Sequence, residues 1–333
     1  MKLGVHDLLL RQAGQTNKEV FSDTKKLVKA VDDLSYDRYW FAEHHGFENL
    51  LSVAPEILAT HFLAITENLT IGTGGTMIMH YSPLKIAETF KTMAELYPDR
   101  VDLGIGRAPG AGPREIRALN QDFSNKSRDL YDEIKVILDY LEDIKPDDYI
   151  YSQALAVPTN NEKLVNPWML GSTGQAMAKA AEYGLSYSHA KFFSVETPKE
   201  LFTQYKENFR PSSFADKPYV SMSYKMLISD DKDELEYLGK SYDYFTIQQA
   251  RGKKGGLIDP ELVKDYEFDL AEQAILKKSY DLRFILKGSK EEVADILSQE
   301  IEDYKIDEIL AFTPIWGVEN RINTYKNLKE IFE

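Results

Sequence analysis

The sequence predicts an α/β protein built as a closed (β/α)8 TIM barrel, and three observations support this prediction. Short apolar runs alternate with helical patterns along most of the 333 residues. Eight strand–helix units can be counted, which is the number that closes a parallel barrel. No domain boundary, repeat or low-complexity tract interrupts them. We therefore expect residues 1–333 to form a single barrel domain, with a helical insertion after the seventh strand.

The expected strands are short apolar runs, and each helical pattern between them has one apolar face. A helix between two strands carries the chain back to the starting edge, so that the next strand can pair in parallel with the previous one. The strands are expected at residues 3–5, 38–42, 69–78, 101–105, 168–170, 185–193, 219–229 and 309–312. The helices are expected at about 19–34, 53–66, 83–97, 126–143, 175–183, 198–208, 289–303 and 318–331.

Capping signals mark several of these helix boundaries. Ser82 followed by Pro83 has the pattern of an N-cap and a proline in the first turn. Gly184 has the position of a glycine that ends a helix in the left-handed conformation. Ser289 and Glu292 have the spacing of a capping box. The helix ends are thus predicted independently of the hydrophobic pattern.

Two segments do not fit a simple strand–helix unit. Residues 145–166 have no clear period, and we expect an irregular excursion that contains a small hairpin. Residues 231–287 are too long for one crossover helix and contain Gly252, Gly255 and Gly256. We expect the latter segment to be a helical insertion with a flexible part, a candidate lid over the barrel mouth.

Composition excludes several classes of function. The formal net charge is −14, and no dense Lys/Arg stripe occurs, which argues against nucleic acid or an anionic membrane as a partner. The chain has no cysteine, so disulfides, thiolate catalysis and Cys-ligated metals are excluded. The N-terminus becomes polar too early for a signal peptide, and no apolar run has the length of a membrane span. We therefore expect a cytoplasmic protein.

Histidines collect at the predicted strand ends, where barrel enzymes carry their chemistry. Each one alone is more often a satisfied core residue, but five of six at one end of the barrel favour a site. His44 is the best single candidate, because Glu43 directly precedes it and could fix its tautomer. His45 and Glu43 could instead be structural, tied to neighbouring loops. The five histidines are His6, His44, His45, His80 and His189.

A metal centre is the rival interpretation of these histidines. No His-x-His ends the first strand, and no His-Glu-x-x-His stands on a predicted helix. We therefore predict no metal site, although metal-dependent hydrolysis stays open as an alternative.

A glycine-rich turn follows the fifth strand and suits a phosphate. Gly171 to Gln175 (GSTGQ) leads into a helix, whose first N–H groups and two neighbouring hydroxyls could bind an anion. Arg107 ends the fourth strand, which is adjacent in a barrel, and its guanidinium could grip the same phosphate. A plain βα turn with an N-cap is the alternative. We expect Arg107, Ser172, Thr173 and Gly174 to bind the phosphate.

A second group of glycines, Gly72, Gly74 and Gly75, ends the third strand. Glycines there allow close backbone approach by a flat ligand or an unusual peptide geometry. Apolar and aromatic residues are expected around the same mouth, and together with the phosphate turn they suggest a pocket for an aromatic ring system and an apolar substrate. They are Phe41, Met77, Met79, Tyr81, Phe192, Phe193 and Trp316.

Four segments, in the right order, resemble the bacterial luciferase-like flavin monooxygenases, and residues 287–293 (KGSKEEV) with the eighth strand resemble the C-terminal part of that family. The four segments are Arg38–His45 (RYWFAEHH), Ile71–Leu84 (IGTGGTMIMHYSPL), Arg100–Gly110 (RVDLGIGRAPG) and Leu170–Gln175 (LGSTGQ). The resemblance covers about 1–230 and 285–330, and it is weakest over the predicted insertion.

The resemblance implies a barrel that binds reduced FMN (FMNH2) and uses O2 to oxidise a small organic, aldehyde-like substrate. Arg107, Ser172, Thr173 and Gly174 would hold the phosphate. Gly74 and Gly75 would lie against the isoalloxazine, where the family often has a non-proline cis peptide. His44 would be the catalytic histidine. A separate flavin reductase would supply the reduced cofactor, and the protein would be a homodimer.

The same resemblance leaves two alternatives open. One is a deazaflavin-dependent dehydrogenase on the same fold, which would pass a hydride and ignore oxygen. The other is a flavin-binding protein without turnover. Gly106 stands where the luciferase catalytic subunit has a reactive cysteine, so the resemblance does not imply light emission.

Overall fold

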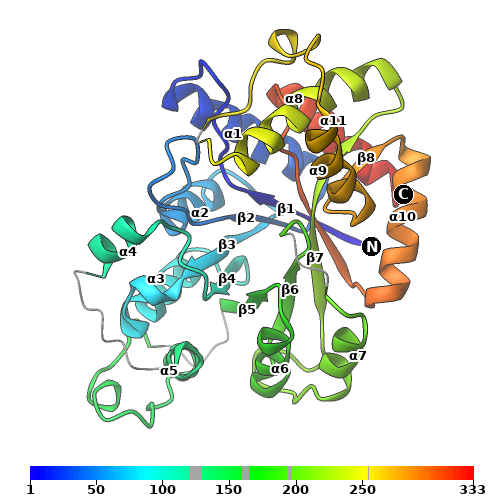
Figure 1. Cartoon of the computed structure of the whole chain (residues 1–333). Helices are drawn as coiled ribbons and strands as arrows, with labels where there is room; N and C mark the ends of the chain where they lie inside the picture. Colours follow the sequence, from blue (N-terminus) through cyan, green and yellow to red (C-terminus); the bar gives the residue numbers. More distant parts are fainter. Residues whose placement is uncertain (121–128, 160–164, 194–196, 254) are drawn as a thin grey trace.

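The structure is a computed structural model that describes residues 1–120, 129–159, 165–193, 197–253 and 255–333. Its centre is a closed barrel of eight parallel strands with helices around the outside, as the sequence predicts (Figure 1). The strands pair in chain order from β1 to β7, and β9 closes the barrel because it pairs with both β7 and β1. The barrel strands are β1 (Lys2–Asp7), β2 (Arg38–Phe41), β3 (Thr70–Met77), β4 (Val101–Gly106), β5 (Val165–Gly171), β6 (Ser186–Ala190), β7 (Val220–Ile228) and β9 (Glu308–Phe312).

Helices connect the strands and cover the outside of the barrel (Figure 1). In the described parts of the chain, no helix is both long and apolar enough to cross a membrane. The α-helices are α1 (Asn17–Asp33), α2 (Pro55–Leu63), α3 (Pro83–Leu96), α4 (Pro113–Leu119), α5 (Leu130–Leu141), α6 (Gly174–Tyr183), α7 (Glu200–Glu207), α8 (Lys232–Ala250), α9 (Leu270–Asp281), α10 (Lys290–Tyr304) and α11 (Val318–Ile331). Short 3-10 helices are η1 (Ile78–His80), η2 (Tyr151–Gln153) and η3 (Pro260–Leu262).

The predicted caps are mostly confirmed. Ser289 and Glu292 form a reciprocal capping box at the start of α10. Gly184 ends α6 with φ = 64°, a left-handed conformation that glycine adopts without steric cost. Pro83 does begin α3, but the Ser82 side chain makes no capping hydrogen bond, so that part of the prediction is wrong. A proline at the first helical position has no N–H group, so one of the donors that a cap would satisfy is absent.

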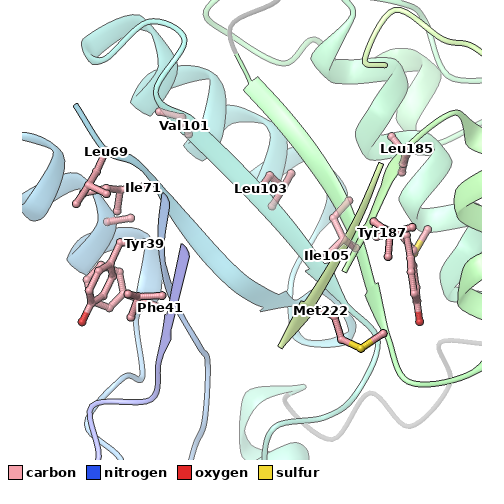
Figure 2. Close-up of a cluster of buried hydrophobic side chains, with 14 of the residues drawn as sticks. Tyr39, Phe41, Leu69, Ile71, Val101, Leu103, Ile105, Leu185, Tyr187 and Met222 are labelled. Carbon is pink, nitrogen blue, oxygen red and sulfur yellow. The ribbon is translucent and has the colours of Figure 1, made fainter. Parts of the chain in front are cut away.

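The main core lies between the barrel wall and the helices. Residues two apart on a strand share a face, so alternate residues of each strand point outward into this layer. Figure 2 shows the result for β4, where Val101, Leu103 and Ile105 stand in one row. Phe41 of β2 stacks on Phe62 of α2, with ring centroids 5.3 Å apart. Phe41 therefore packs against a helix, not at the barrel mouth where it was expected.

The lower interior of the barrel holds a buried charge cluster. The Arg38 guanidinium donates hydrogen bonds to Asp102 and Glu308, which come from β4 and β9. It also lies over the Trp168 ring, 4.4 Å from the centroid. Trp40 donates to the Asp102 carboxylate at 2.8 Å. Because each buried charge has a partner of opposite sign, the cluster fills the space below the barrel mouth without an unpaired ion.

Strands β3 and β4 approach each other unusually closely, and glycines make this contact. A Cβ on Gly72 would lie 1.9 Å from the Asp102 carbonyl oxygen. A Cβ on Gly104 would lie 2.1 Å from the Thr73 carbonyl oxygen. Real Cβ atoms do not come so near to backbone oxygens, so only glycine fits these two positions.

The predicted insertion at 231–287 is helical, and it contains α8, η3 and α9. The sequence analysis missed the short strand β8 (Ile285–Gly288), which follows α9 at the end of the insertion. β8 pairs in parallel with Lys225–Ile228, while β6 pairs with Val220–Ser223 earlier in β7. The extra strand thus extends the sheet beside the upper half of β7 and does not change barrel closure.

Two features of local structure differ from the sequence analysis, one expected and not found, the other found and not expected. No hairpin occurs in the described part of 145–166, which contains η2 and reaches β5 at Val165; residues 160–164 lie outside the described residues. The short helix α4 was not predicted. It begins with Pro113 and has no buried residue, so its sequence carries no hydrophobic period.

The glycine contact between β3 and β4 gives a test of the barrel wall. Gly104→Ala should destabilise the protein by about 3 kcal/mol, because the new methyl group overlaps the Thr73 carbonyl. Urea denaturation measures the change. Gly255→Ala is the matched control, since a Cβ there has no heavy atom within 4 Å, and its free energy of unfolding should change little. Equal effects of the two substitutions would contradict the proposed close contact.

Candidate functional site

The predicted site residues lie at the carboxyl rim of the barrel. His6 is near the end of β1, His44 follows β2, and Gly74 and Gly75 lie in the last part of β3. Arg107 directly follows β4. Since all eight barrel strands are parallel, these ends share one rim, which is where barrel enzymes place their sites.

The peptide between Gly74 and Gly75 is cis, as the resemblance implies. The register between β3 and β4 shifts at this point. A Cβ on Gly75 would lie 2.7 Å from the Gly104 carbonyl oxygen, so this part of β3 presents bare backbone. A flat ligand could therefore approach the main chain here without meeting a side chain on Gly74 or Gly75.

His6 contacts this bend and was undervalued in the sequence analysis. Its Nε2 donates a hydrogen bond to the Gly74 carbonyl oxygen, so Nε2 carries the ring proton. Nδ1 is then an acceptor, and it is buried without a hydrogen-bond partner. Burial lowers the pKa of His6 to about 4. The imidazole is therefore neutral at pH 7 and has one acceptor unused.

His44 is also a neutral, partly buried imidazole. Its backbone N–H donates to the Ser52 carbonyl at 3.0 Å, which fixes the main chain after β2. Its ring packs edge-on against Phe47, and its Nδ1 is buried with no partner. Burial, followed by the charges of His6 and His45, lowers the pKa of His44 to about 4. Such a group can accept or donate a hydrogen bond at neutral pH.

Glu43 does not fix the tautomer of His44, so that expectation was wrong. Its carboxylate is buried and pairs instead with His45 Nε2 at 2.8 Å. It also accepts hydrogen bonds from the Met77 N–H at 2.8 Å and the Tyr81 hydroxyl at 2.6 Å. Glu43 therefore ties the end of β2 to the end of β3, which is the structural role kept open as the alternative.

The five histidines separate into groups with different surroundings. His6 and His44 are close enough for the charge of one to lower the pKa of the other. His45 and His80 face each other, with ring centroids 5.9 Å apart. His189 packs against Phe202 of α7, outside the barrel wall, so it does not join the mouth. The single cluster expected from the sequence thus reduces to His6 and His44 at the site.

No three His, Asp or Glu side chains in the described ranges are grouped as a metal site requires. The carboxylate nearest to the histidines, Glu43, is already engaged by three donors. The metal-dependent alternative has no support from the geometry of the described residues.

Arg107 lies over the ring of Tyr131, the second residue of α5, at 4.2 Å from the centroid. Within the described chain, no carboxylate or hydrogen-bond acceptor pairs with its guanidinium. Lys179 of α6 lies over the same ring at 5.8 Å. Tyr131 therefore brings the cation after β4 next to α6, the helix that follows the glycine-rich turn. The sequence carried no signal for this contact, since no motif joins residues 107 and 131.

The turn before α6 has the open helix end that an anion needs. α6 begins at Gly174, and the Thr173 side chain makes no capping hydrogen bond in the described structure. The first N–H groups of a helix have no partner inside the helix. Thr197 donates from its hydroxyl to the Ser172 carbonyl at 3.1 Å, which anchors the turn from the other side.

Aromatic residues after β6 form the apolar wall of the site. The Phe192 ring lies 5.5 Å from the His6 ring and 4.7 Å from the Phe193 ring, between centroids. Phe312, at the end of β9, is 6.4 Å from Phe192. Phe192 is buried, whereas Phe193 is 54% exposed. Of the aromatic residues predicted at the mouth, Phe192 and Phe193 contact the site histidines or each other.

The residues at the barrel rim fit a flavin, because several of their polar atoms lack, in the described structure, a hydrogen-bond or ion-pair partner that a ligand could supply. Among the described residues, two imidazole nitrogens are buried without partners, and the guanidinium of Arg107 has no counter-ion. Arg107 follows β4, and the adjacent strand β5 leads into the uncapped start of α6. Buried polar atoms and unpaired cations are costly unless a ligand completes them. The fold and the rim site together are those of a barrel enzyme.

The comparisons with known proteins agree with this class. The luciferase-like monooxygenase family matches residues 1–307. Bacillus subtilis YwcH is 32% identical over 321 residues, which cover 96% of this chain and 95% of that protein. The N-acetyl-S-alkylcysteine monooxygenase of Bacillus subtilis is 28% identical over 334 residues, with 99% and 98% coverage. The structure of apo-MsnO8 has a TM-score of 0.89 at 27% identity and covers 99% of this chain and 98% of its own.

This chain belongs to the luciferase-like monooxygenase family, and it is an oxidoreductase of that family.

More distant structures share the fold. The oxygenating constituent of 3,6-diketocamphane monooxygenase from Pseudomonas putida, in complex with FMN, has a TM-score of 0.70 at 16% identity, covering 99% of this chain and 97% of that chain. An F420-dependent secondary alcohol dehydrogenase has a TM-score of 0.62 at 17% identity, with the same coverage. The same barrel thus occurs with two cofactor types.

The buried histidines predict a pH dependence of stability. Burial lowers the pKa of His6 to about 4 and that of His189 to about 3. Below pH 6.5 the unfolded chain binds a proton on each imidazole, whereas the folded protein binds it only near pH 4 or lower. The free energy of unfolding should therefore fall as the pH falls from 6.5 to 4, by about 1.4 kcal/mol per pH unit for each such histidine.

Urea denaturation between pH 8 and pH 4.5 measures this slope. His189→Phe removes one of the groups outside the site, and its slope should be smaller than that of the wild type by one histidine's contribution. Parallel curves for the two proteins would contradict the neutral, buried state of His189.

Proposed function

We propose that this protein is an FMN-dependent monooxygenase, which uses reduced FMN and O2 to oxidise a small, aldehyde-like organic substrate. The observation that carries the proposal is the Arg107 guanidinium, which has no acidic partner among the described residues and follows β4, the strand that pairs with β5, whose following turn leads into the uncapped start of α6. A guanidinium and helix N–H groups are the partners that a terminal phosphate such as that of FMN prefers. The family membership and the FMN complex of a protein with the same fold support the same cofactor.

In this proposal Arg107, Ser172, Thr173 and Gly174 bind the phosphate, and Gly74 and Gly75 offer bare backbone to the isoalloxazine. Reduced flavin, when bound, supplies the electrons that activate O2. His44 acts as the catalytic group: its neutral imidazole holds or moves a proton beside the reacting oxygen. Phe192 and Phe312 exclude water from the same space. The apolar wall fits an apolar substrate body.

The proposal includes how the enzyme is supplied and assembled. As the family resemblance implies, a separate flavin reductase would deliver the reduced FMN, and we place both proteins in the cytoplasm. We also propose a homodimer of single-domain chains. Ile57 on α2 and Leu96 on α3 are 66% and 61% exposed, and a second copy would cover such large apolar side chains.

Oxygen transfer is tested with isotopically labelled gas. The protein is mixed with FMN, a flavin reductase and NADH as its electron donor, 18O2, and a panel of aldehydes and N-acetyl-S-alkylcysteines, and the products are analysed by mass spectrometry. One labelled oxygen atom per product molecule is the expected result. Oxidation that needs a deazaflavin, proceeds without O2 and leaves no label in the product would overturn the proposal in favour of a dehydrogenase.

Arg107→Ala should weaken the binding of FMN by about 2 kcal/mol or more, roughly 30-fold, because the charged partner of the phosphate is lost. Quenching of flavin fluorescence measures the dissociation constant. Arg114→Ala is the matched control, since Arg114 is exposed on α4. An affinity that stays the same in Arg107→Ala would show that the phosphate binds elsewhere.

His44→Ala should keep the FMN affinity of the wild type and lose oxygen transfer by about 100-fold or more, the usual effect of removing a proton-transfer group. The labelled-oxygen assay measures turnover, and flavin fluorescence measures binding in the same preparation. Normal turnover in this variant would assign the catalytic role to another residue.

A further inference from the structure

Tyr131 is the residue on which this inference depends. It lies in the first turn of α5, and its side chain is 1% exposed. Its backbone N–H donates to the Asp129 carboxylate at 3.0 Å, and its carbonyl accepts from the Tyr183 hydroxyl at 3.2 Å. Its own hydroxyl is buried and has no hydrogen-bond partner in the described structure. A hydroxyl in this state costs free energy unless a ligand completes it.

The surroundings of this hydroxyl are those of an anion site. The Arg107 guanidinium lies over the ring at 4.2 Å, and Lys179 lies over it at 5.8 Å. Lys179 is paired with Glu182 at 2.7 Å, whereas Arg107 has no ion-pair partner in the described ranges. Asp129 is the acidic neighbour, and one of its oxygens caps α5. The unpaired positive charge at this point is therefore that of Arg107.

Tyr187 of β6 links Tyr131 to the glycine-rich turn. Tyr131 lies near the Tyr187 hydroxyl, which is buried in the wall of β6, and this proximity adds to the larger effect of burial in raising the pKa of Tyr187. That hydroxyl lies 3.3 Å from the point where a Cβ on Gly171 would stand. The Tyr131 ring therefore lies under Arg107, and Tyr131 is close to a tyrosine that borders the start of the turn.

Tyr131 is a donor at neutral pH. Burial is the largest cause that raises its pKa, and it outweighs the opposing effects of Arg107 and Lys179. A neutral tyrosine hydroxyl can donate one hydrogen bond. The missing partner of this hydroxyl is therefore an acceptor, and the adjacent unpaired cation favours an acceptor with negative charge.

We propose that Tyr131 is a phosphate-binding residue, whose hydroxyl donates to the same terminal phosphate that Arg107 and the turn before α6 hold. This inference rests on the proposed flavin site and adds to it a residue from a third element, α5. It also explains the stacking, because the Tyr131 ring orients the guanidinium toward the ligand that its hydroxyl contacts.

The test uses Tyr131→Phe, which keeps the ring under Arg107 and removes only the hydroxyl. The dissociation constants of FMN and of riboflavin, which lacks the phosphate, are measured by fluorescence quenching. Loss of a hydrogen bond to a charged group should weaken FMN binding about 10- to 100-fold and leave riboflavin binding unchanged. Without flavin, the melting temperature should not fall, since the lost hydroxyl had no partner.

Tyr183→Phe is the matched control. Its hydroxyl is on α6 near the same ring and already has a partner, so its removal should lower the melting temperature slightly and leave FMN affinity unchanged. Inorganic phosphate is a second probe: it should raise the melting temperature of the wild type more than that of Tyr131→Phe.

The outcomes separate the two proposals. Unchanged FMN affinity in Tyr131→Phe, or an equal loss for FMN and riboflavin, would overturn the role of Tyr131 and leave the flavin site standing. If the wild-type protein binds FMN no more tightly than riboflavin, and inorganic phosphate does not raise its melting temperature, both the phosphate site and the role of Tyr131 are overturned.

Discussion

The constraint on which the structure depends is the closure of the barrel between β1 and β9. Leu3 pairs with Ile309, while Gly4 pairs on its other side with Arg38 of β2. With this contact the first and last strands become neighbours, and no strand edge of the barrel is left open. It also brings residues from every part of the chain to one rim. Without it, the ends of β1 and β9 would lie at opposite edges of an open sheet, and His6 and Phe312 could not both contact Phe192.

Within this frame, two buried groups of polar residues hold the two ends of the barrel in different ways. Arg38 joins β2, β4 and β9 in the lower interior through a triad of charges. Glu43 joins the ends of β2 and β3 near the mouth by accepting three hydrogen bonds. The second group leaves the His44 side chain free of strong contacts while its backbone is fixed. A fixed backbone beneath a loosely held side chain is what the proposed catalytic role of His44 would require.

Much of this could be predicted from the sequence. The eight barrel strands follow from alternating apolar runs, and several helix ends follow from capping residues such as Ser289 and Gly184. The contacts that could not be predicted depend on the direction of side chains in loops, where the sequence has no helical or strand periodicity. The residues after β2 are adjacent in sequence, yet His45 pairs with Glu43 while the His44 ring packs against Phe47. β8 was missed because nothing in a run of four residues shows that the upper half of β7 needs a partner.

The narrow separation of β3 and β4 has a consequence for changing the enzyme. Every position of this seam whose Cβ would meet a carbonyl oxygen, Gly72 and Gly104 above all, is closed to variation whatever the substrate. In a mutant library designed to change the substrate range, variants at these glycines would mostly fail to fold. The productive positions are those where the wall is made by side chains alone, such as Phe192 and Phe193. The site therefore has one rigid wall, the β3–β4 seam, which fixes the shape of the cofactor that can bind. Its other wall is made of side chains that can be exchanged, and these select the substrate.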